Sequence, residues 1–100
     1  MAKMRYEIVL APEAVRDLKQ LRAHERAAVR DALETYLRHG PTKTSRSRIK
    51  RLRKLTHPEY RLRVGEIRVF YDVSDGRVEV LAIIPKSRAR EWLESVGEES

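Results

Sequence analysis

The feature that most limits the possible folds is an alternation of apolar and polar residues interrupted by one turn signal. Residues 60–64 read Tyr-Arg-Leu-Arg-Val, residues 67–73 read Ile-Arg-Val-Phe-Tyr-Asp-Val, and Gly65-Glu66 separates them. Side chains alternate between the two faces of a strand, so these segments predict a β-hairpin with one apolar face. The opposite face then carries three arginines and one aromatic ring, namely Arg61, Arg63, Arg68 and Phe70.

The flanking sequence predicts a strand and two helices before the hairpin, and a strand and a helix after it. Residues 6–10 alternate as a strand does, and Pro12 can begin a helix whose apolar stripe is Val15, Leu18 and Leu21. Gly40 and Pro41 end a second helix with one apolar face, made of Ala28, Val29, Ala32, Leu33, Tyr36 and Leu37. Residues 77–84 read as a strand buried on both faces, and residues 87–96 as a short helix.

These elements follow the order β-α-α-β-β-β-α and predict one domain over residues 1–100. The predicted class is α+β, with the helical hairpin packed on a four-stranded, mainly antiparallel sheet and a short helix at the C-terminus. The N-terminal strand is expected at an edge of the sheet or beside the last strand.

The charge of the chain favours an anionic partner. The formal net charge is +7 and the sequence pI is about 10.1, which indicates nucleic acid unless the protein is simply a soluble basic one. Between residues 41 and 55 there is no acidic residue, and the basic residues predicted to bind a polyanion are Lys43, Arg46, Arg48, Lys50, Arg51, Arg53 and Lys54. In contrast, the segment from Glu91 to the end contains four glutamates and no basic residue, and it is not expected to contact a polyanion.

Several other chemistries are not predicted. The sequence has no cysteine, no apolar run near the roughly 20 residues of a membrane span, and no glycine-rich phosphate loop. His24, His39 and His57 lie on unrelated segments without metal-ligand spacing. We therefore expect a cytoplasmic protein with no membrane, no metal and no small-molecule cofactor.

The three hairpin arginines favour a phosphate site over an ordinary solvated face. Like charges opposite one another in a sheet are destabilising, so a solvated face usually mixes both signs. Three guanidinium groups on one face, next to the basic segment, fit a phosphate backbone, and Phe70 either stacks on a base or packs in the core.

The order and spacing of four segments resemble the RelE/ParE superfamily of bacterial and archaeal toxins from toxin–antitoxin pairs. The segments are LAPEAVRDLKQL, RLRKL, EYRLRVGEIRVFYDV and VEVLAIIPKSRAREWL, and together they span nearly the whole chain. The resemblance implies the same β-α-α-β-β-β-α fold, a cognate antitoxin as partner and, for the RelE branch, ribosome-dependent cleavage of messenger RNA.

In that branch the 2′-hydroxyl attacks the adjacent phosphate, and the 5′-oxygen leaves. The resemblance places the catalytic residues at Arg61, Arg63, Arg68, Lys86 and Arg88. Arg68 would clamp the scissile phosphate, Arg61 and Arg63 would hold flanking phosphates, and Lys86 would donate a proton or stabilise charge. The basic segment would hold ribosomal RNA through phosphate contacts.

The general base is not assigned by the resemblance, and other functions stay open. RelE-like enzymes often carry a tyrosine or histidine in the C-terminal segment, whereas residues 86–93 contain neither. Tyr60 or Tyr71 is an alternative base. Without a base, the chain fits a non-catalytic inhibitor of DNA gyrase, as in the ParE branch, or a non-toxic RNA-binding module.

Overall fold

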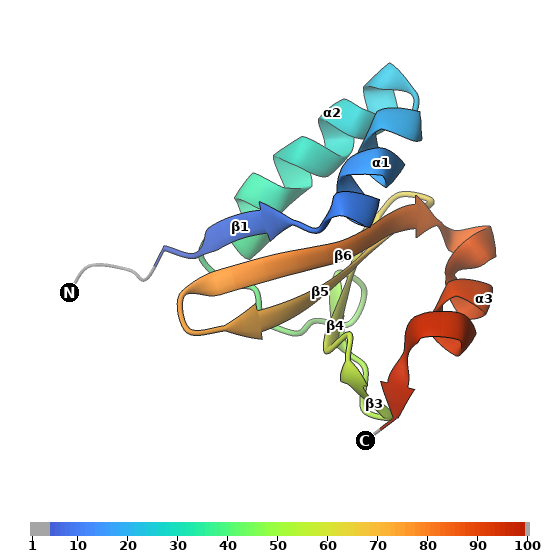
Figure 1. The fold of residues 1–100 in the computed structure, drawn as a ribbon. Coiled ribbons are helices and arrows are strands. Elements are labelled where there is room, and N and C mark those ends of the chain that lie inside the picture. Colours follow the sequence, from blue (N-terminus) through green and yellow to red (C-terminus); the bar gives the residue numbers. More distant parts are fainter. Residues whose placement is uncertain (1–4, 100) are drawn as a thin grey trace.

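The computed structural model describes residues 5–99, with side chains through residue 97, and a sheet lies at its centre (Figure 1). Five strands of the described chain form this sheet, in the order β1 (Glu7–Leu10), β6 (Arg77–Pro85), β5 (Ile67–Ser74), β4 (Tyr60–Val64) and β2 (Ile49–Arg51). β1 runs parallel to β6, and the other neighbours are antiparallel. The predicted α+β class, the mainly antiparallel sheet and the edge position of β1 beside β6 are confirmed.

The predicted number of strands was one too few, because β2 was not anticipated. β2 has only three residues, two of them basic, and so it has no readable alternation. It becomes a strand by pairing with β4, where Ile49 lies opposite Leu62 and Arg51 opposite Tyr60. Two further short strands, β3 (Leu55–His57) and β7 (Glu98–Glu99), pair with each other in the described chain and were not predicted either.

Two helices cover one face of the sheet (Figure 1). α1 (Pro12–Gln20) starts with proline at its first turn, and α2 (Ala23–Ala32) continues into a π-helical turn, η1 (Leu33–Leu37). α2 begins after Arg22, whose backbone N–H donates to Glu25 Oε1 at 3.2 Å. Most of the predicted apolar positions are buried or half-buried, but Val15 and Ala28 are exposed and Ala14 is buried instead.

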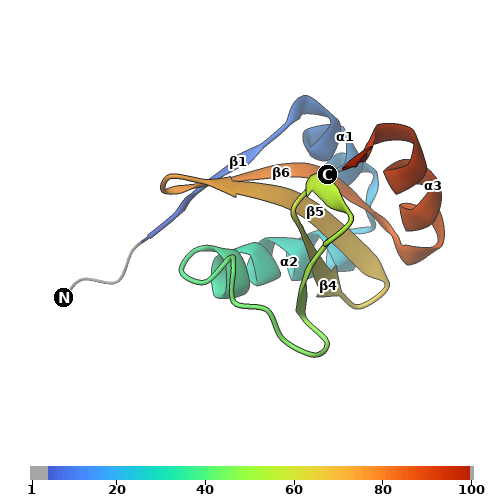
Figure 2. The same ribbon diagram turned by 90° about the horizontal axis from the view of Figure 1, so that it is seen from below.

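The third helix, α3 (Lys86–Val96), packs on the other face of the sheet. Figure 2 shows α2 and α3 on different sides of the β5–β6 hairpin. The larger core lies under α1 and α2 and includes Val69 and Tyr71, whereas Phe70 and Ile84 form a smaller core under α3. Residues 67–71 of β5 and 80–84 of β6 are therefore covered on both faces, whereas Arg77 and Glu79 at the start of β6 are exposed. The sequence predicted burial on both faces for β6 alone and over residues 77–84.

The turn of the β4–β5 hairpin depends on glycine. Gly65 has a φ of 59°, a conformation that side chains other than glycine rarely adopt, and it stands at the first central position of the turn. The resulting register pairs Tyr60 with Tyr71 and Arg63 with Arg68. This register confirms the predicted hairpin and decides which side chains meet across it.

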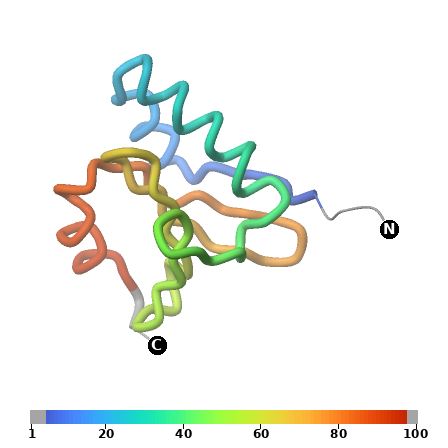
Figure 3. The backbone as a smooth tube through the Cα atoms, turned by 180° about the vertical axis from the view of Figure 1, so that it is seen from behind, coloured from blue at the N-terminus to red at the C-terminus, as the bar shows by residue number. Residues whose placement is uncertain are grey.

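The segment after η1 is anchored to the core by a buried tyrosine. Figure 3 shows this segment crossing from the end of α2 to the edge of the sheet beside β4. The Tyr71 hydroxyl is fully buried and donates to the Pro41 carbonyl at 2.6 Å, while burial, with a smaller effect of Tyr60, raises the pKa of Tyr71. No helix in the described part of the chain is long and apolar enough to span a membrane.

Replacing Tyr71 with phenylalanine removes this hydrogen bond and leaves the ring in place. We expect the free energy of unfolding to fall by about 1–2 kcal/mol, because the Pro41 carbonyl loses its buried donor. Urea denaturation measures the loss, with Tyr36→Phe at a half-buried ring as the matched control. Equal stability of the two variants would contradict the anchoring role of Tyr71.

Candidate functional site

The arginines of the β4–β5 hairpin lie on the face of the sheet that α3 partly covers. Arg63 stands opposite Arg68 in the ladder, and Arg61 stands opposite Phe70. Their neighbours Leu62 and Val69 point into the core under α1 and α2. The predicted gathering of the three arginines on one face is therefore found in the fold.

An open groove lies between this face and α3, with a volume of about 490 Å³. We call it the basic groove, and the residues that line it come from β2, β4, β5, α3 and the segment after β2. Its polar lining residues are Lys50, Arg61, Arg68, Lys86, Arg90 and Glu94, and its apolar lining residues are Leu52, Phe70, Ala89 and Leu93. Five cations and one carboxylate thus share the groove.

Arg68 is the buried cation of the groove, with only 7% of its surface exposed. Its Nη1 donates to the carbonyl of Gly65 at 2.8 Å and to that of Ile67 at 3.1 Å. These bonds tie the guanidinium to its own hairpin turn, so Arg68 has a structural role that the sequence did not reveal. Its Nε and Nη2 remain as the donors able to hold a phosphate through two parallel hydrogen bonds.

Arg61 is half-buried among other cations. Burial lowers the pKa of the Arg61 guanidinium, and the charges of Arg68 and Arg63 lower it further. Its Nε is buried without a hydrogen-bond partner. Burying a charge without a partner is unfavourable, and an anion at this position would relieve both the repulsion and the unpaired donor.

The cations of the groove are not neutralised by the protein. Among the side chains that the structure describes, the ion pairs are Arg38–Glu34, His57–Asp72 and Arg77–Glu7, none of which includes a groove residue. An array of unneutralised cations around a concave surface attracts anionic ligands. The described residues contain no group of three or more side chains suited to hold a metal ion.

Of the two positions that the sequence left open for Phe70, stacking on a base or packing in the core, the structure shows the core position. Phe70 is 1% exposed, and its ring stacks on Trp92 of α3 with centroids 5.0 Å apart. The hairpin places Phe70 on the arginine face as expected, but α3 covers the ring and makes it the centre of the smaller core. A base cannot stack on Phe70 while α3 is in this position.

The cations of α3 are arranged differently from the prediction. Lys86 begins α3 and lines the groove, and its backbone N–H donates to the Glu66 carbonyl at 2.7 Å. Arg88 is exposed and does not line the groove, whereas Arg90 does. Residues four apart share one helix face, so the spacing of Lys86 and Arg90 is the signal that identifies Arg90.

The basic segment from Lys43 to Lys54 divides among several surfaces. Lys50 of β2 lines the basic groove, whereas Lys43 and Arg48 line a separate cavity beside η1. Arg46 is exposed in the loop, and the guanidinium carbon of Arg51 lies 5.4 Å from the centroid of the Tyr60 ring. Arg53 and Lys54 line a third hollow together with Lys50. The segment therefore follows the edge of the sheet.

Neither tyrosine considered as a general base lies in the groove. Tyr60 and Tyr71 stack on each other, with ring centroids 5.5 Å apart, against the core under α1 and α2. His57 is held by Asp72 through its Nδ1 at 2.9 Å and lines a different hollow, beside Trp92. The acidic side chain that lines the groove is Glu94, which the sequence suggested was remote from any polyanion.

Comparisons with known proteins find similarity to both the sequence and the fold of this chain. A family model described as the ParE toxin of type II toxin–antitoxin systems matches residues 8–90. No curated protein sequence matches the chain.

Three solved structures illustrate the likeness of the fold. The RelBE2 toxin–antitoxin complex of Mycobacterium tuberculosis is similar at 25% identity and a TM-score of 0.70, covering 81% of this chain and 98% of that one. The archaeal RelE–RelB complex of Pyrococcus horikoshii is also 25% identical, with a TM-score of 0.63 and coverage of 85% and 99%. The YoeB–YefM complex of Staphylococcus aureus is 21% identical, with a TM-score of 0.63 and coverage of 80% and 95%.

Replacing Arg61 with methionine removes the half-buried cation and keeps an unbranched side chain. We expect the free energy of unfolding to rise by up to about 1 kcal/mol, because solvent already screens part of the repulsion. Salt should stabilise the wild type more than this variant, because salt screens repulsion between the arginines. Urea denaturation at low and high salt measures both effects.

The matched control is Arg16→Met, which removes an exposed cation from α1. A larger loss of stability in Arg61→Met than in Arg16→Met would contradict the view that Arg61 is electrostatically unfavourable in the folded protein.

Proposed function

This chain belongs to the ParE toxin family, within the RelE/ParE superfamily of type II toxin–antitoxin toxins, and we propose that it is a ribosome-dependent messenger-RNA endonuclease. The observation that carries the proposal is the basic groove, in which Arg61 is half-buried, has an unpaired Nε and has no carboxylate partner. A half-buried, unpaired arginine lowers the stability of the fold and is not needed for solubility. In an enzyme that binds phosphate, the same group contributes to binding of the substrate.

The proposed reaction is attack of a ribose 2′-hydroxyl on the adjacent phosphate. A bond forms between the 2′-oxygen and phosphorus, and the bond to the 5′-oxygen breaks. The products are a 2′,3′-cyclic phosphate and a free 5′-hydroxyl. The phosphate gains negative charge in the transition state, so fixed cations aimed at it accelerate the step.

The residues of the groove have distinct proposed roles. Arg68 holds the scissile phosphate through Nε and Nη2, while the carbonyl bonds to its Nη1 keep the guanidinium in place. Arg61 stabilises the charge that develops on the phosphate, and Lys86 gives a proton to the departing 5′-oxygen. Lys50 holds a neighbouring phosphate, and so does Arg63, which is exposed on the same face of the sheet but does not line the groove. The other basic residues at the edge of the sheet contact ribosomal RNA.

The acceptor of the 2′-hydroxyl proton is proposed to be Glu94. The lining residues of the groove other than Glu94 are cationic or apolar, and only this carboxylate can accept a proton without first losing one. Because Glu94 lies on α3, the position of this helix would decide whether the acceptor meets its substrate.

A cognate antitoxin is the proposed partner. The similar structures named above are complexes of toxins with antitoxins. An acidic or amphipathic segment would match the unneutralised groove electrostatically and block access of RNA.

The first experiment expresses the chain in a translating extract with a defined message and maps the new 5′ ends. We expect cuts only when ribosomes are present, and a loss of rate of about 100-fold in Arg61→Gln, because one charge-stabilising group is removed. Arg16→Gln is the control for the change in net charge.

The competing function is inhibition of DNA gyrase without chemistry, which the ParE description of the family and the lack of tyrosine or histidine in the groove favour. If the message stays whole while DNA supercoiling stops, the endonuclease proposal is wrong.

The role of Glu94 has its own test. Glu94→Gln keeps the shape of the side chain and removes the proton acceptor, so we expect the single-turnover cleavage rate to fall by about 100-fold or more. Binding of the message should be unchanged or slightly stronger, because one negative charge is lost. The exposed Glu91→Gln is the control on the same helix. Equal rates for the two variants would eliminate Glu94 as the acceptor.

A further inference from the structure

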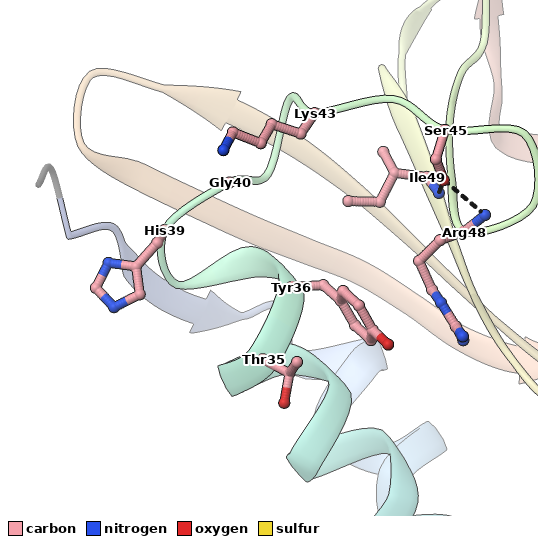
Figure 4. Close-up of a pocket in the computed structure, with 8 residues that line it drawn as sticks. All are labelled: Thr35, Tyr36, His39, Gly40, Lys43, Ser45, Arg48 and Ile49. Atoms are coloured by element: carbon pink, nitrogen blue, oxygen red, sulfur yellow. Dashed lines mark hydrogen bonds between the residues drawn. The ribbon is translucent and has the colours of Figure 1, made fainter.

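A second basic cavity lies on the opposite side of the edge strand from the basic groove. This open cavity is lined by the turn η1, the loop that leads to β2 and the first residue of β2, and its volume is about 470 Å³ (Figure 4). The side chains used below are those of Thr35, Tyr36, Lys43, Ser45, Arg48 and Ile49. No carboxylate lines this cavity in the described chain.

The Arg48 guanidinium lies over the Tyr36 ring at one end of the cavity, and we call this pair the Tyr36–Arg48 platform. The guanidinium carbon of Arg48 lies 4.7 Å from the centroid of the Tyr36 ring. Arg48 is also held by its Nη1, which donates to the Arg63 carbonyl at 3.0 Å. Guanidinium planes and aromatic rings are the surfaces on which unpaired bases stack.

A cation stands at the other end of the cavity. In Figure 4 the Lys43 side chain extends along Gly40, away from the Tyr36–Arg48 platform, and the Ile49 side chain points between the two. A Cβ at residue 40 would lie 3.1 Å from the Lys43 Cδ, so the absence of a side chain at Gly40 leaves space for the Lys43 side chain. The backbone N–H of Lys43 donates to the Gly40 carbonyl at 3.1 Å and fixes the turn.

Hydrogen bonds hold the cavity in shape. The Ser45 hydroxyl oxygen accepts the backbone N–H of Arg48 at 3.0 Å and keeps its own hydrogen to donate to a ligand. The Ser45 backbone N–H donates to the Ile49 carbonyl at 2.9 Å, and the Tyr71–Pro41 bond anchors the start of the loop. A cavity that is already formed loses little conformational entropy when a ligand binds.

We propose that this cavity binds a single unpaired nucleotide of an RNA strand, a proposal that rests on the RNA target proposed above. The base extends the Tyr36–Arg48 stack, Ser45 and Thr35 hydrogen-bond the base or sugar, and Lys43 holds the phosphate. The phosphate is assigned to Lys43 because the Arg48 guanidinium already lies over the Tyr36 ring and donates to the Arg63 carbonyl.

The cavity and the groove are connected through the edge strand. On β2, Ile49 faces this cavity, and the next residue, Lys50, lines the basic groove. Arg48 also pairs with β4 next to the hairpin arginines, since the Arg63 N–H donates to the Arg48 carbonyl at 2.9 Å. An RNA strand that rounds this edge would place one nucleotide in the cavity and its neighbours near the groove.

The test is a titration of the full chain with adenosine 5′-monophosphate, followed by the backbone amide signals in NMR. We expect saturable shifts at residues 35–36 and 43–49. Arg48→Lys keeps the charge but loses the planar surface, so it should weaken binding of the nucleotide about tenfold and leave binding of inorganic phosphate unchanged. Lys43→Gln should weaken both ligands, whereas Lys19→Gln on the exposed side of α1 should weaken neither.

Two results would overturn the proposal. Inorganic phosphate that binds as tightly as the nucleotide would make the cavity a simple anion site. A glutamate-rich peptide that shifts the same amides more strongly than the nucleotide would assign the cavity to a protein partner.

The cleavage assay separates this proposal from the proposed function. One outcome is that the wild type and Arg48→Lys cut the message equally fast while the nucleotide does not bind. In that case the cavity proposal is wrong and the endonuclease proposal stands. If the nucleotide binds as expected but the wild type cuts no message, then the endonuclease fails and the nucleotide site stands.

Discussion

The register of the β4–β5 hairpin is the constraint on which the rest of the molecule depends. With Gly65 in a left-handed conformation, Val64 pairs with Ile67 and Arg63 with Arg68. A shift of one residue would move every side chain of a strand to the other face of the sheet. It would place the arginines in the core and expose Leu62 and Val69 instead. The free energy gained by burying the larger core therefore offsets the repulsion among the arginines on the opposite face.

The arginine face is divided by α3 into a covered part and an open part. Trp92 stacks on Phe70 and closes the smaller core, while Lys86, Arg90 and Glu94 from the same helix complete the open groove. One helix thus supplies both apolar cover and polar groups, because residues on adjacent parts of its surface face different parts of the sheet. A movement of α3 away from the sheet would widen the groove and expose Phe70 at the same time.

Hydrogen bonds from side chains to backbone carbonyls hold the basic surfaces in place. Arg68 is tied to the hairpin turn, Arg48 to β4, and the loop after η1 to the buried hydroxyl of Tyr71. Arginine in these places acts as a structural donor and as a cation at once. A lysine has no planar fork, and it would not hold the backbone and present a flat face to a ligand in the same way.

The sequence by itself determined the local features: the alternation that makes β4 and β5, the apolar run that makes β6, the glycine turn, the start of α1 at Pro12, and the face on which the three arginines lie. Each of these is decided by residues close together in the chain. The resemblance to the RelE/ParE superfamily rested on the order of such segments, and the family match confirmed it.

Only the tertiary structure decided the features that join distant segments. β2 is a strand because β4 lies beside it, Phe70 is buried because Trp92 covers it, and Glu94 lines the groove because α3 packs against the arginine face. The Tyr36–Arg48 platform likewise joins a helix to a loop. Periodicity reports which face of its own element a residue occupies, but not which distant element that face meets, because that depends on how the whole chain packs.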